Sequence, residues 1–276
     1  MLTNMKKELE EARKHQYAIP QFNINNLEWT KYILEECEKQ NNPVILGISE
    51  STIEYIGGYQ TVVNMILGLI SDLNITIPVS IHLDHGSSLE SCEKAIKAGF
   101  TSVMIDVSSK SLEENIKETK KVIQLADNKI LTEAEVGVVG RKEQEKNYAN
   151  LEDCQKLSNI GIDLLAPAIG NQHGIYKGQA DLNFNLLEDI SKVTNIPLVL
   201  HGASGMQDTL ILRCIKNGIS KINFNTDLQI AWSKEIRKYI EQNEKEYDPR
   251  KIIKSGEFAI KNTIKEKIEL LNSCRQ

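Results

Sequence analysis

The chain has 276 residues, of which 41% are hydrophobic and 26% are charged, and its formal net charge at pH 7 is −5. This composition is typical of a soluble globular protein, and an acidic chain without a long basic stripe is not expected to bind nucleic acid. No apolar run approaches the roughly 20 residues that cross a membrane, and the polar N-terminal residues 1–7 contain no signal core. The five cysteines are odd in number and lack CxxC spacing, so we expect free thiols in a protein of the reducing cytoplasm.

Apolar runs of strand length alternate with segments of helical periodicity along the chain. The first half predicts, in order, a helix at 9–14, a strand at 17–22, a helix at 27–40, a strand at 43–48, a helix at 59–73, a strand at 79–84, a helix at 89–98 that ends at Gly99, a strand at 101–105 and a helix at 112–126. The second half predicts a strand at 130–136, a polar loop at 137–149, a helix at 151–160, a strand at 163–169, a long loop, a helix at 186–193, a strand at 197–200, a helix at 210–217 and a strand at 221–224. The last barrel helix is expected to start at 225–227, and a separate amphipathic helix is expected to include residues 260–271.

This alternation determines the expected fold. Strands that are each followed by a helix predict a parallel sheet with right-handed crossovers. Eight such units at this length favour a (β/α)8 TIM barrel, with additional C-terminal helices, over an open sheet. We expect residues 1–276 to form this single barrel domain.

Polar residues gather where the predicted strands end, which is where barrel enzymes place their active sites. The residues at these ends are Asn23, Ser49, Asp84, His85, Asp106, Glu133, Glu135, His173, His201 and Asn223. Three of the five histidines belong to this set, and His85, His173 and His201 are each followed by glycine. Three imidazoles from separate strands are a common catalytic zinc arrangement, so the sequence predicts a metal site rather than three unrelated histidines.

Asp84 directly precedes His85. If strand geometry persists there, the two side chains diverge, and Asp84 is not expected to be a fourth ligand. A carboxylate that is near a metal but not bound to it suits a general acid or base, the alternative being a carboxylate that orients a histidine. His82, inside the strand, is expected to have a supporting role. A Schiff-base mechanism would need a buried lysine, and no lysine follows a predicted strand end.

The loops at 201–205 and 223–226 follow the last two predicted strands. Loops in these places often bind phosphate in barrels through backbone N–H groups and helix N-termini. Ordinary turns and helix caps are the alternative explanation. Lys177, four residues after His173, is a candidate cation for the same phosphate.

Several segments together resemble the class II, metal-dependent ketose-bisphosphate aldolases, and most closely the short bacterial fructose-1,6-bisphosphate aldolases. The segments that carry the resemblance are 21–26, 82–86 (HLDHG), 98–106, 133–135, 163–178, 200–205 and 248–250. The resemblance implies that His85, His173 and His201 bind Zn²⁺. It implies that Asp84 handles the C4 hydroxyl proton and that Asn223 steadies the enediolate.

The same resemblance implies further roles around this centre. Glu143 falls where the family's active-site loop carries the glutamate that exchanges the C3 proton of dihydroxyacetone phosphate, and Asp106 and Glu135 resemble supporting or alternative metal positions. The implied site for the dihydroxyacetone-phosphate phosphate, with Na⁺ or K⁺ nearby, consists of Gly174, Lys177, Gly202, Ser204, Asn225 and Thr226. The implied contacts to the rest of the substrate are Asn23, Ser49 and Arg250, with the arginine supplied by a neighbouring subunit.

The implied activity is that of a lyase of glycolysis. It is the reversible cleavage of a ketose 1,6-bisphosphate, first of all fructose 1,6-bisphosphate, to dihydroxyacetone phosphate and glyceraldehyde 3-phosphate through a zinc-stabilised enediolate. The protein would be a cytoplasmic homodimer or homotetramer. Alternatives are an aldolase for tagatose bisphosphate or 6-phospho-5-dehydro-2-deoxygluconate, a non-catalytic sugar-phosphate-binding relative, or a zinc hydrolase on the same barrel.

Two segments depart from the family pattern. The loop that usually has Gly-Gly-x-Glu-Asp is Gly-Arg-Lys-Glu-Gln at 140–144, and Val-Ser-Ser follows Asp106 in place of Ala-Ser-His or Gly-Ser-His. These changes leave the expected metal ligands intact and bear on turnover and substrate choice.

Overall fold

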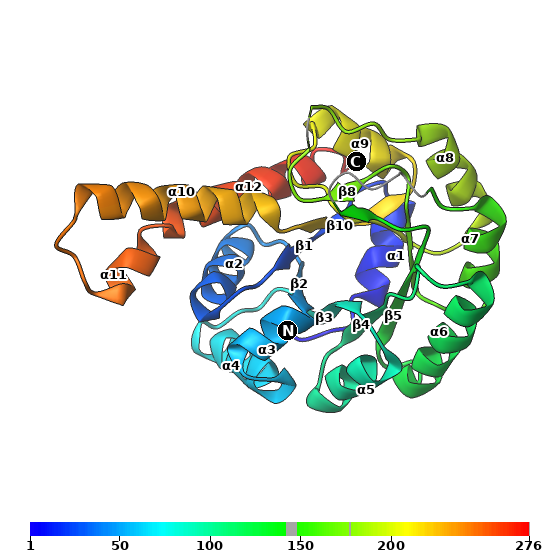
Figure 1. Cartoon of the computed structure of the whole chain (residues 1–276), viewed down its shortest axis with the longest axis horizontal. Coiled ribbons are helices and arrows are strands. Elements are labelled where there is room, and N and C mark those ends of the chain that lie inside the picture. The colour runs from blue at the N-terminus through cyan, green and yellow to red at the C-terminus, as the bar shows by residue number, and fades with distance from the viewer. Residues whose placement is uncertain (142–147, 177, 276) are drawn as a thin grey trace.

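A computed structural model of the chain describes residues 1–141, 148–176 and 178–275 (Figure 1). The strands are β1 (Ile19–Asn23), β2 (Val44–Ser49), β3 (Val79–Gly86), β4 (Ser102–Ile105), β5 (Leu131–Val136), β6 (Gly140–Arg141), β7 (Leu164–Pro167), β8 (Gln172–His173), β9 (Leu198–Leu200) and β10 (Ile219–Phe224). Eight of them form a closed barrel of parallel strands in the order β1-β10-β9-β7-β5-β4-β3-β2. The predicted (β/α)8 barrel with additional C-terminal helices is therefore confirmed.

Most helices cover the outside of this barrel, and they include the last helix, which contacts β1 (Figure 1). The helices are α1 (Lys6–Lys14), α2 (Leu27–Lys39), α3 (Glu50–Ile56), α4 (Tyr59–Asp72), α5 (Leu89–Ala98), α6 (Leu112–Ala126), α7 (Leu151–Ser158), α8 (Phe184–Val193), α9 (Asp208–Lys216), α10 (Thr226–Gln242), α11 (Pro249–Lys254) and α12 (Glu257–Asn272). α5 has the predicted bounds: the Ser88 side chain accepts a hydrogen bond from the Ser91 backbone N–H at 3.2 Å, and Gly99 ends the helix with φ 106°. A glycine adopts this left-handed conformation without the steric cost of a side chain.

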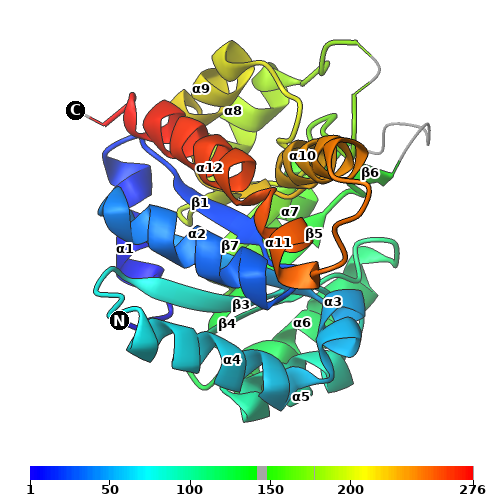
Figure 2. The same ribbon diagram turned by 90° about the vertical axis from the view of Figure 1, so that its left-hand side faces the viewer.

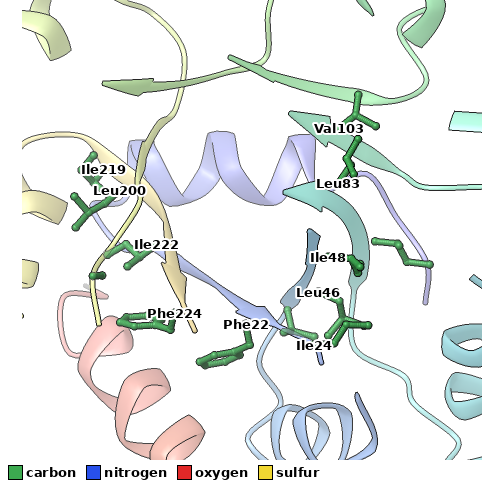
Figure 3. Close-up of a cluster of buried hydrophobic side chains, with 14 of the residues drawn as sticks. Phe22, Ile24, Leu46, Ile48, Leu83, Val103, Leu200, Ile219, Ile222 and Phe224 are labelled. Carbon is green, nitrogen blue, oxygen red and sulfur yellow. The ribbon is translucent and has the colours of Figure 1, made fainter. Parts of the chain in front are cut away.

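The alternation in β3 separates the core from the barrel interior. Val79, Ile81 and Leu83 are buried in the apolar cluster between strands and helices. The side chains between them, Ser80, His82 and Asp84, are buried polar groups. Successive side chains of a strand point to opposite faces, so β3 directs its polar residues to the inside of the barrel. Figure 3 shows Leu83 in the apolar layer with residues of β1, β2, β4, β9 and β10.

The N-terminal end of the barrel is closed by α1 (Figure 1). Leu9 of α1 is buried in a second apolar cluster with Ile19, Leu131 and Leu164, which begin β1, β5 and β7. Because this end is filled with apolar side chains, the opposite end is the one open to a polar ligand.

Two short strands lie outside the barrel. β6 pairs in parallel with β8, with Gly140 opposite Gln172 and Arg141 opposite His173. The expectation of a continuous loop at 137–149 is therefore wrong at residues 140–141, while 142–147 lie outside the described residues. Two-residue strands are too short to produce a detectable period in the sequence.

The C-terminal helices extend the molecule to one side. α10 and α11 project away from the barrel in Figure 1, and Figure 2 looks onto this projection. α12 returns to pack on α2 and α10. Within residues 1–141, 148–176 and 178–275, no helix is both long and apolar enough to cross a membrane.

Candidate active site

A cavity of about 230 Å³ lies at the C-terminal ends of the barrel strands. It is lined by Asn23, Ser49, Asp84, His85, His173, Gly174, His201, Gly202, Ser204, Asn223, Asn225 and Thr226. All of these are among the candidate residues identified from the sequence. A second cavity of about 520 Å³ shares Thr226 with it and lies between α2, α3 and α10.

The three histidines form the centre of this cavity. His85, His173 and His201 come from β3, β8 and the end of β9, and their ligand atoms lie within 4.8 Å of one another. His85 Nδ1 lies 2.7 Å from Asp106 Oδ2, and its buried Nε2 has no hydrogen-bond partner among the described residues. His201 Nε2 lies 2.8 Å from Glu133 Oε1, which leaves Nδ1 for another contact. Imidazoles held by carboxylates through one nitrogen are typical zinc ligands through the other, so these residues fit a zinc ion.

His85 has an unusual backbone that explains how it shares the cavity with Asp84. Its φ is 57°, and the pairing of β3 with β4 shifts register between Leu83 and Gly86. Regular strand geometry therefore does not persist there, so the condition under which we expect the side chains of Asp84 and His85 to diverge is not met, and both line the cavity. Such an irregularity re-aims a side chain without interrupting the strand.

Two amides hold the Asp84 carboxylate. Asn23 Nδ2 donates to Oδ2 at 2.7 Å, and Asn223 Nδ2 donates to Oδ1 at 3.4 Å. Burial alone would raise the pKa of Asp84, but the neighbouring His85 and His201 lower it well below its ordinary value. Asp84 is therefore ionised at neutral pH and able to accept a proton.

A second group of possible metal ligands shares His85. Asp106 and Glu135 lie with it so that their ligand atoms are within 4.8 Å of one another. Ser108 joins the two carboxylates, donating to Asp106 Oδ1 at 2.7 Å and to Glu135 Oε1 at 3.1 Å. Burial, and then the charge of Asp106, raise the pKa of Glu135 to about 8. Burial opposes the charge of Asp106, but its hydrogen bond with His85 holds its pKa below the ordinary value, so the proton near neutral pH belongs to Glu135. The ligand atoms of the group are close enough together to hold a cation.

The two predicted phosphate loops lie side by side. Ser204 Oγ accepts hydrogen bonds from the backbone N–H groups of Asn225 and Asp227, each at 3.3 Å. Gly202 has φ 66°, and a Cβ there would lie 2.1 Å from the backbone oxygen of Gln172. Glycine is therefore required where the loop after β9 contacts β8. The loop after β10 leads directly into the N-terminus of α10, where helix N–H groups favour anions.

Among the described residues, Arg250 is the one predicted substrate contact that does not line this cavity. Arg250 is at the projecting α11, its side chain is 88% exposed, and its guanidinium pairs with Asp248 at 2.8 Å. Glu143 and Lys177 lie outside the described residues.

Sequence reasoning overlooks two interior residues. Lys221 of β10 is fully buried and pairs with Glu133 at 2.7 Å. Gln21 of β1 is also fully buried and donates from Nε2 to Asn23 Oδ1 at 3.3 Å. Each lies two positions before a predicted site residue on the same strand, which is the signal that could have identified it.

Comparisons with known proteins agree with this geometry. Residues 3–276 match the model of the family described as fructose-bisphosphate aldolase class-II. The chain is 50% identical over 270 residues to a fructose-bisphosphate aldolase of Geobacillus stearothermophilus, covering 95% of this chain and 94% of that protein. It is 49% identical over 275 residues to a fructose-bisphosphate aldolase of Staphylococcus aureus (strain Mu50 / ATCC 700699), covering 97% of this chain and 96% of that protein.

Solved structures share the fold. The YdjI aldolase from Escherichia coli K12 superimposes with a TM-score of 0.86 at 30% identity, covering 99% of this chain and 98% of that chain. The fructose-bisphosphate aldolase of Campylobacter jejuni has a TM-score of 0.81 at 24% identity, covering 100% of this chain and 97% of that chain. At this identity the comparison supports the fold alone.

Proposed function

Because the chain belongs to the class II fructose-bisphosphate aldolase family and is thus a lyase, we propose that it reversibly cleaves fructose 1,6-bisphosphate to dihydroxyacetone phosphate and glyceraldehyde 3-phosphate. The observation that carries this proposal is the convergence of three histidines and an ionised carboxylate in one cavity. Its relatives from Geobacillus stearothermophilus and Staphylococcus aureus are both named fructose-bisphosphate aldolase.

His85, His173 and His201 would hold the zinc ion. When bound, zinc supplies a Lewis acid that disperses the negative charge left by cleavage of the C3–C4 bond. Asp106 and Glu133 support the ligands by hydrogen bonds to the outer nitrogens of His85 and His201. These bonds set which nitrogen of each ring faces the cavity.

Asp84 takes the proton of the C4 hydroxyl group during cleavage and returns it during synthesis. Asn23 and Asn223 orient its two oxygens. The Asn223 amide also borders the cavity, where it can donate a hydrogen bond to an enediolate oxygen. Glu143 is proposed, from the family resemblance, as the group that exchanges the C3 proton.

The substrate's two phosphates would occupy opposite ends of the cavity. The loops that contain Gly202, Ser204, Asn225 and Thr226 offer backbone N–H groups to the phosphate of dihydroxyacetone phosphate, with Gly174 beside them and Lys177 and a Na⁺ or K⁺ ion as further partners. Ser49 lies at the cavity wall for the other phosphate. Two anchored ends would convert binding energy into orientation of the C3–C4 bond.

We further propose a cytoplasmic homodimer. Seventeen-residue α10 has one buried residue, Leu228, and α11 has none within a single chain. Tyr247, between α10 and α11, is 91% exposed, and Phe258, in the first turn of α12, is 81% exposed. Arg250 would then reach the partner's cavity rather than its own.

A coupled assay on zinc-loaded protein tests the activity. We expect triose phosphates from fructose 1,6-bisphosphate, less product from tagatose 1,6-bisphosphate, loss of activity with a chelator, and recovery with Zn²⁺. Release of inorganic phosphate in place of triose phosphates would indicate a hydrolase. Binding of the bisphosphate without cleavage would indicate a non-catalytic relative.

A further inference from the structure

A fully buried lysine lies beneath the three histidines. Lys221 Nζ on β10 is 2.7 Å from Glu133 Oε2 on β5 and 3.5 Å from His82 Nε2 on β3. All three side chains have no exposed surface. β9 and β7 separate β10 from β5 in the barrel, so the lysine crosses the barrel interior to reach its partner. A charged group at this depth requires such a partner.

Glu133 connects the lysine to a candidate metal ligand. Its other oxygen, Oε1, is 2.8 Å from His201 Nε2. Because a carboxylate oxygen accepts hydrogen bonds, Nε2 carries the hydrogen and Nδ1 keeps its lone pair. His201 Nδ1 lies 3.2 Å from Asn223 Nδ2, a cavity residue. Lys221, Glu133 and His201 therefore form one continuous chain that ends at a nitrogen facing the cavity.

We propose that Lys221 is a positioning residue for the metal centre: it holds the Glu133 carboxylate so that His201 presents Nδ1 to the other two histidines. This inference rests on the proposed zinc site. With Lys221 on Oε2 and His201 on Oε1, the carboxylate is restrained at both oxygens. Without the lysine, Oε2 keeps only His82 Nε2, which lies 3.8 Å away and is too far for a hydrogen bond, so the position of the carboxylate is less restrained. Lys221 does not line the cavity, so it acts through Glu133 and not on the substrate.

The Lys221→Met variant tests this role because it keeps a long unbranched side chain and removes the ammonium group. We expect zinc to bind about 10–100-fold more weakly, which is the usual effect of losing an outer partner of a ligand. A competition titration with a chromophoric chelator measures this change. The visible spectrum of the Co²⁺-substituted protein should also change, because it reports ligand geometry without any catalytic turnover.

Ser220→Ala is the matched control. Ser220 is a fully buried neighbour on β10, and its Oγ donates to the Gly218 backbone oxygen at 3.2 Å. The Ser220 hydroxyl bonds to Gly218, whereas Lys221 Nζ bonds to Glu133, so this change affects the same strand but not the Lys221–Glu133 pair. Zinc affinity and the cobalt spectrum should be those of the wild type.

Folded Lys221→Met protein with wild-type zinc affinity and cobalt spectrum would overturn the proposal. If that variant does not fold, the Glu133→Gln variant is compared with the double variant that carries both Lys221→Met and Glu133→Gln. The double variant removes both buried charges together. Equal zinc affinities of these two proteins support action through Glu133, and a further loss in the double variant overturns it. Wild-type protein that binds no zinc would instead overturn the metal site itself, and this inference with it.

Discussion

His85 adopts a left-handed backbone, with φ 57°, that is uncommon for residues other than glycine. Gly86 follows in a crowded place, where a Cβ would lie 2.7 Å from the Met104 backbone oxygen. The pair therefore turns β3 so that an acid and an imidazole face one cavity. The sequence identifies Asp84 and His85 as site residues from their place at a strand end. It does not predict their common direction, because this depends on a register shift relative to β4.

Zinc binding should release protons at neutral pH. Burial opposes the charge on His85, but its hydrogen bond to Asp106 and the charges of Asp84 and Glu135 raise its pKa from 6.5 to about 9. Below that pH the metal-free ring is protonated, while only a neutral imidazole binds zinc. Zinc affinity should therefore rise by up to about tenfold per pH unit until about pH 9.

Calorimetric titration with zinc in two buffers of different ionisation enthalpy measures the number of protons released. Asp106→Asn is the informative variant, because it removes the main partner that raises the pKa of His85. It should release fewer protons near pH 8. A wild-type zinc affinity that is the same at every pH up to about 9 would contradict the expected release of protons.

At the scale of elements, the barrel follows from the sequence and the small connections do not. Strands such as β3 and helices such as α5 have clear periods, so α5 has the predicted bounds and β3 begins at the predicted residue, although it extends to Gly86. β6 and β8 have two residues each and depend on pairing with one another. The burial of Lys221 is not predicted for a related reason. A lysine in a strand is ordinarily solvated, and Lys221 has Glu133 as a partner because the barrel is closed.

The contact between the loop after β9 and β8 can be tested with two glycines of that loop. Gly205 has φ 73° and no neighbouring atom within 4 Å of the place where a Cβ would lie, whereas Gly202 has φ 66° and a backbone oxygen 2.1 Å from that place. Gly205→Ala should cost about 1–2 kcal/mol, from its left-handed backbone alone. Gly202→Ala should cost about 1–3 kcal/mol more, from overpacking against Gln172.

Urea denaturation of both variants measures these differences in the free energy of unfolding. Because Gln172 precedes His173, Gly202→Ala should also weaken zinc binding, and Gly205→Ala should not. Equal unfolding free energies for the two variants would show that the crowding at Gly202 is relieved by movement of β8.

At the scale of the whole molecule, the projection formed by α10 and α11 is the feature that a single chain leaves unexplained (Figure 1). The periodicity of these segments predicts helices but not that they extend beyond the barrel. Their few buried residues and the exposed Tyr247 and Phe258 favour a second copy of the chain as their partner. Arg250, on the same projection, is paired with Asp248 and remote from its own cavity.

Mixing two variants that are impaired at different residues tests whether the site is shared. Asp84→Asn should abolish proton transfer, and Arg250→Ala should weaken phosphate binding, in the respective homodimers. After unfolding and refolding together in equal amounts, half of the dimers contain one subunit of each kind, and one of their two sites has both Asp84 and a partner arginine. Activity should therefore recover to about a quarter of the wild-type value.

Asp84→Asn mixed with Asp84→Ala is the control, and this mixture should recover no activity. If Arg250 acts within its own chain, the mixture should show only the average activity of the two separate variants. Sedimentation of the wild type as a monomer would contradict the shared site directly.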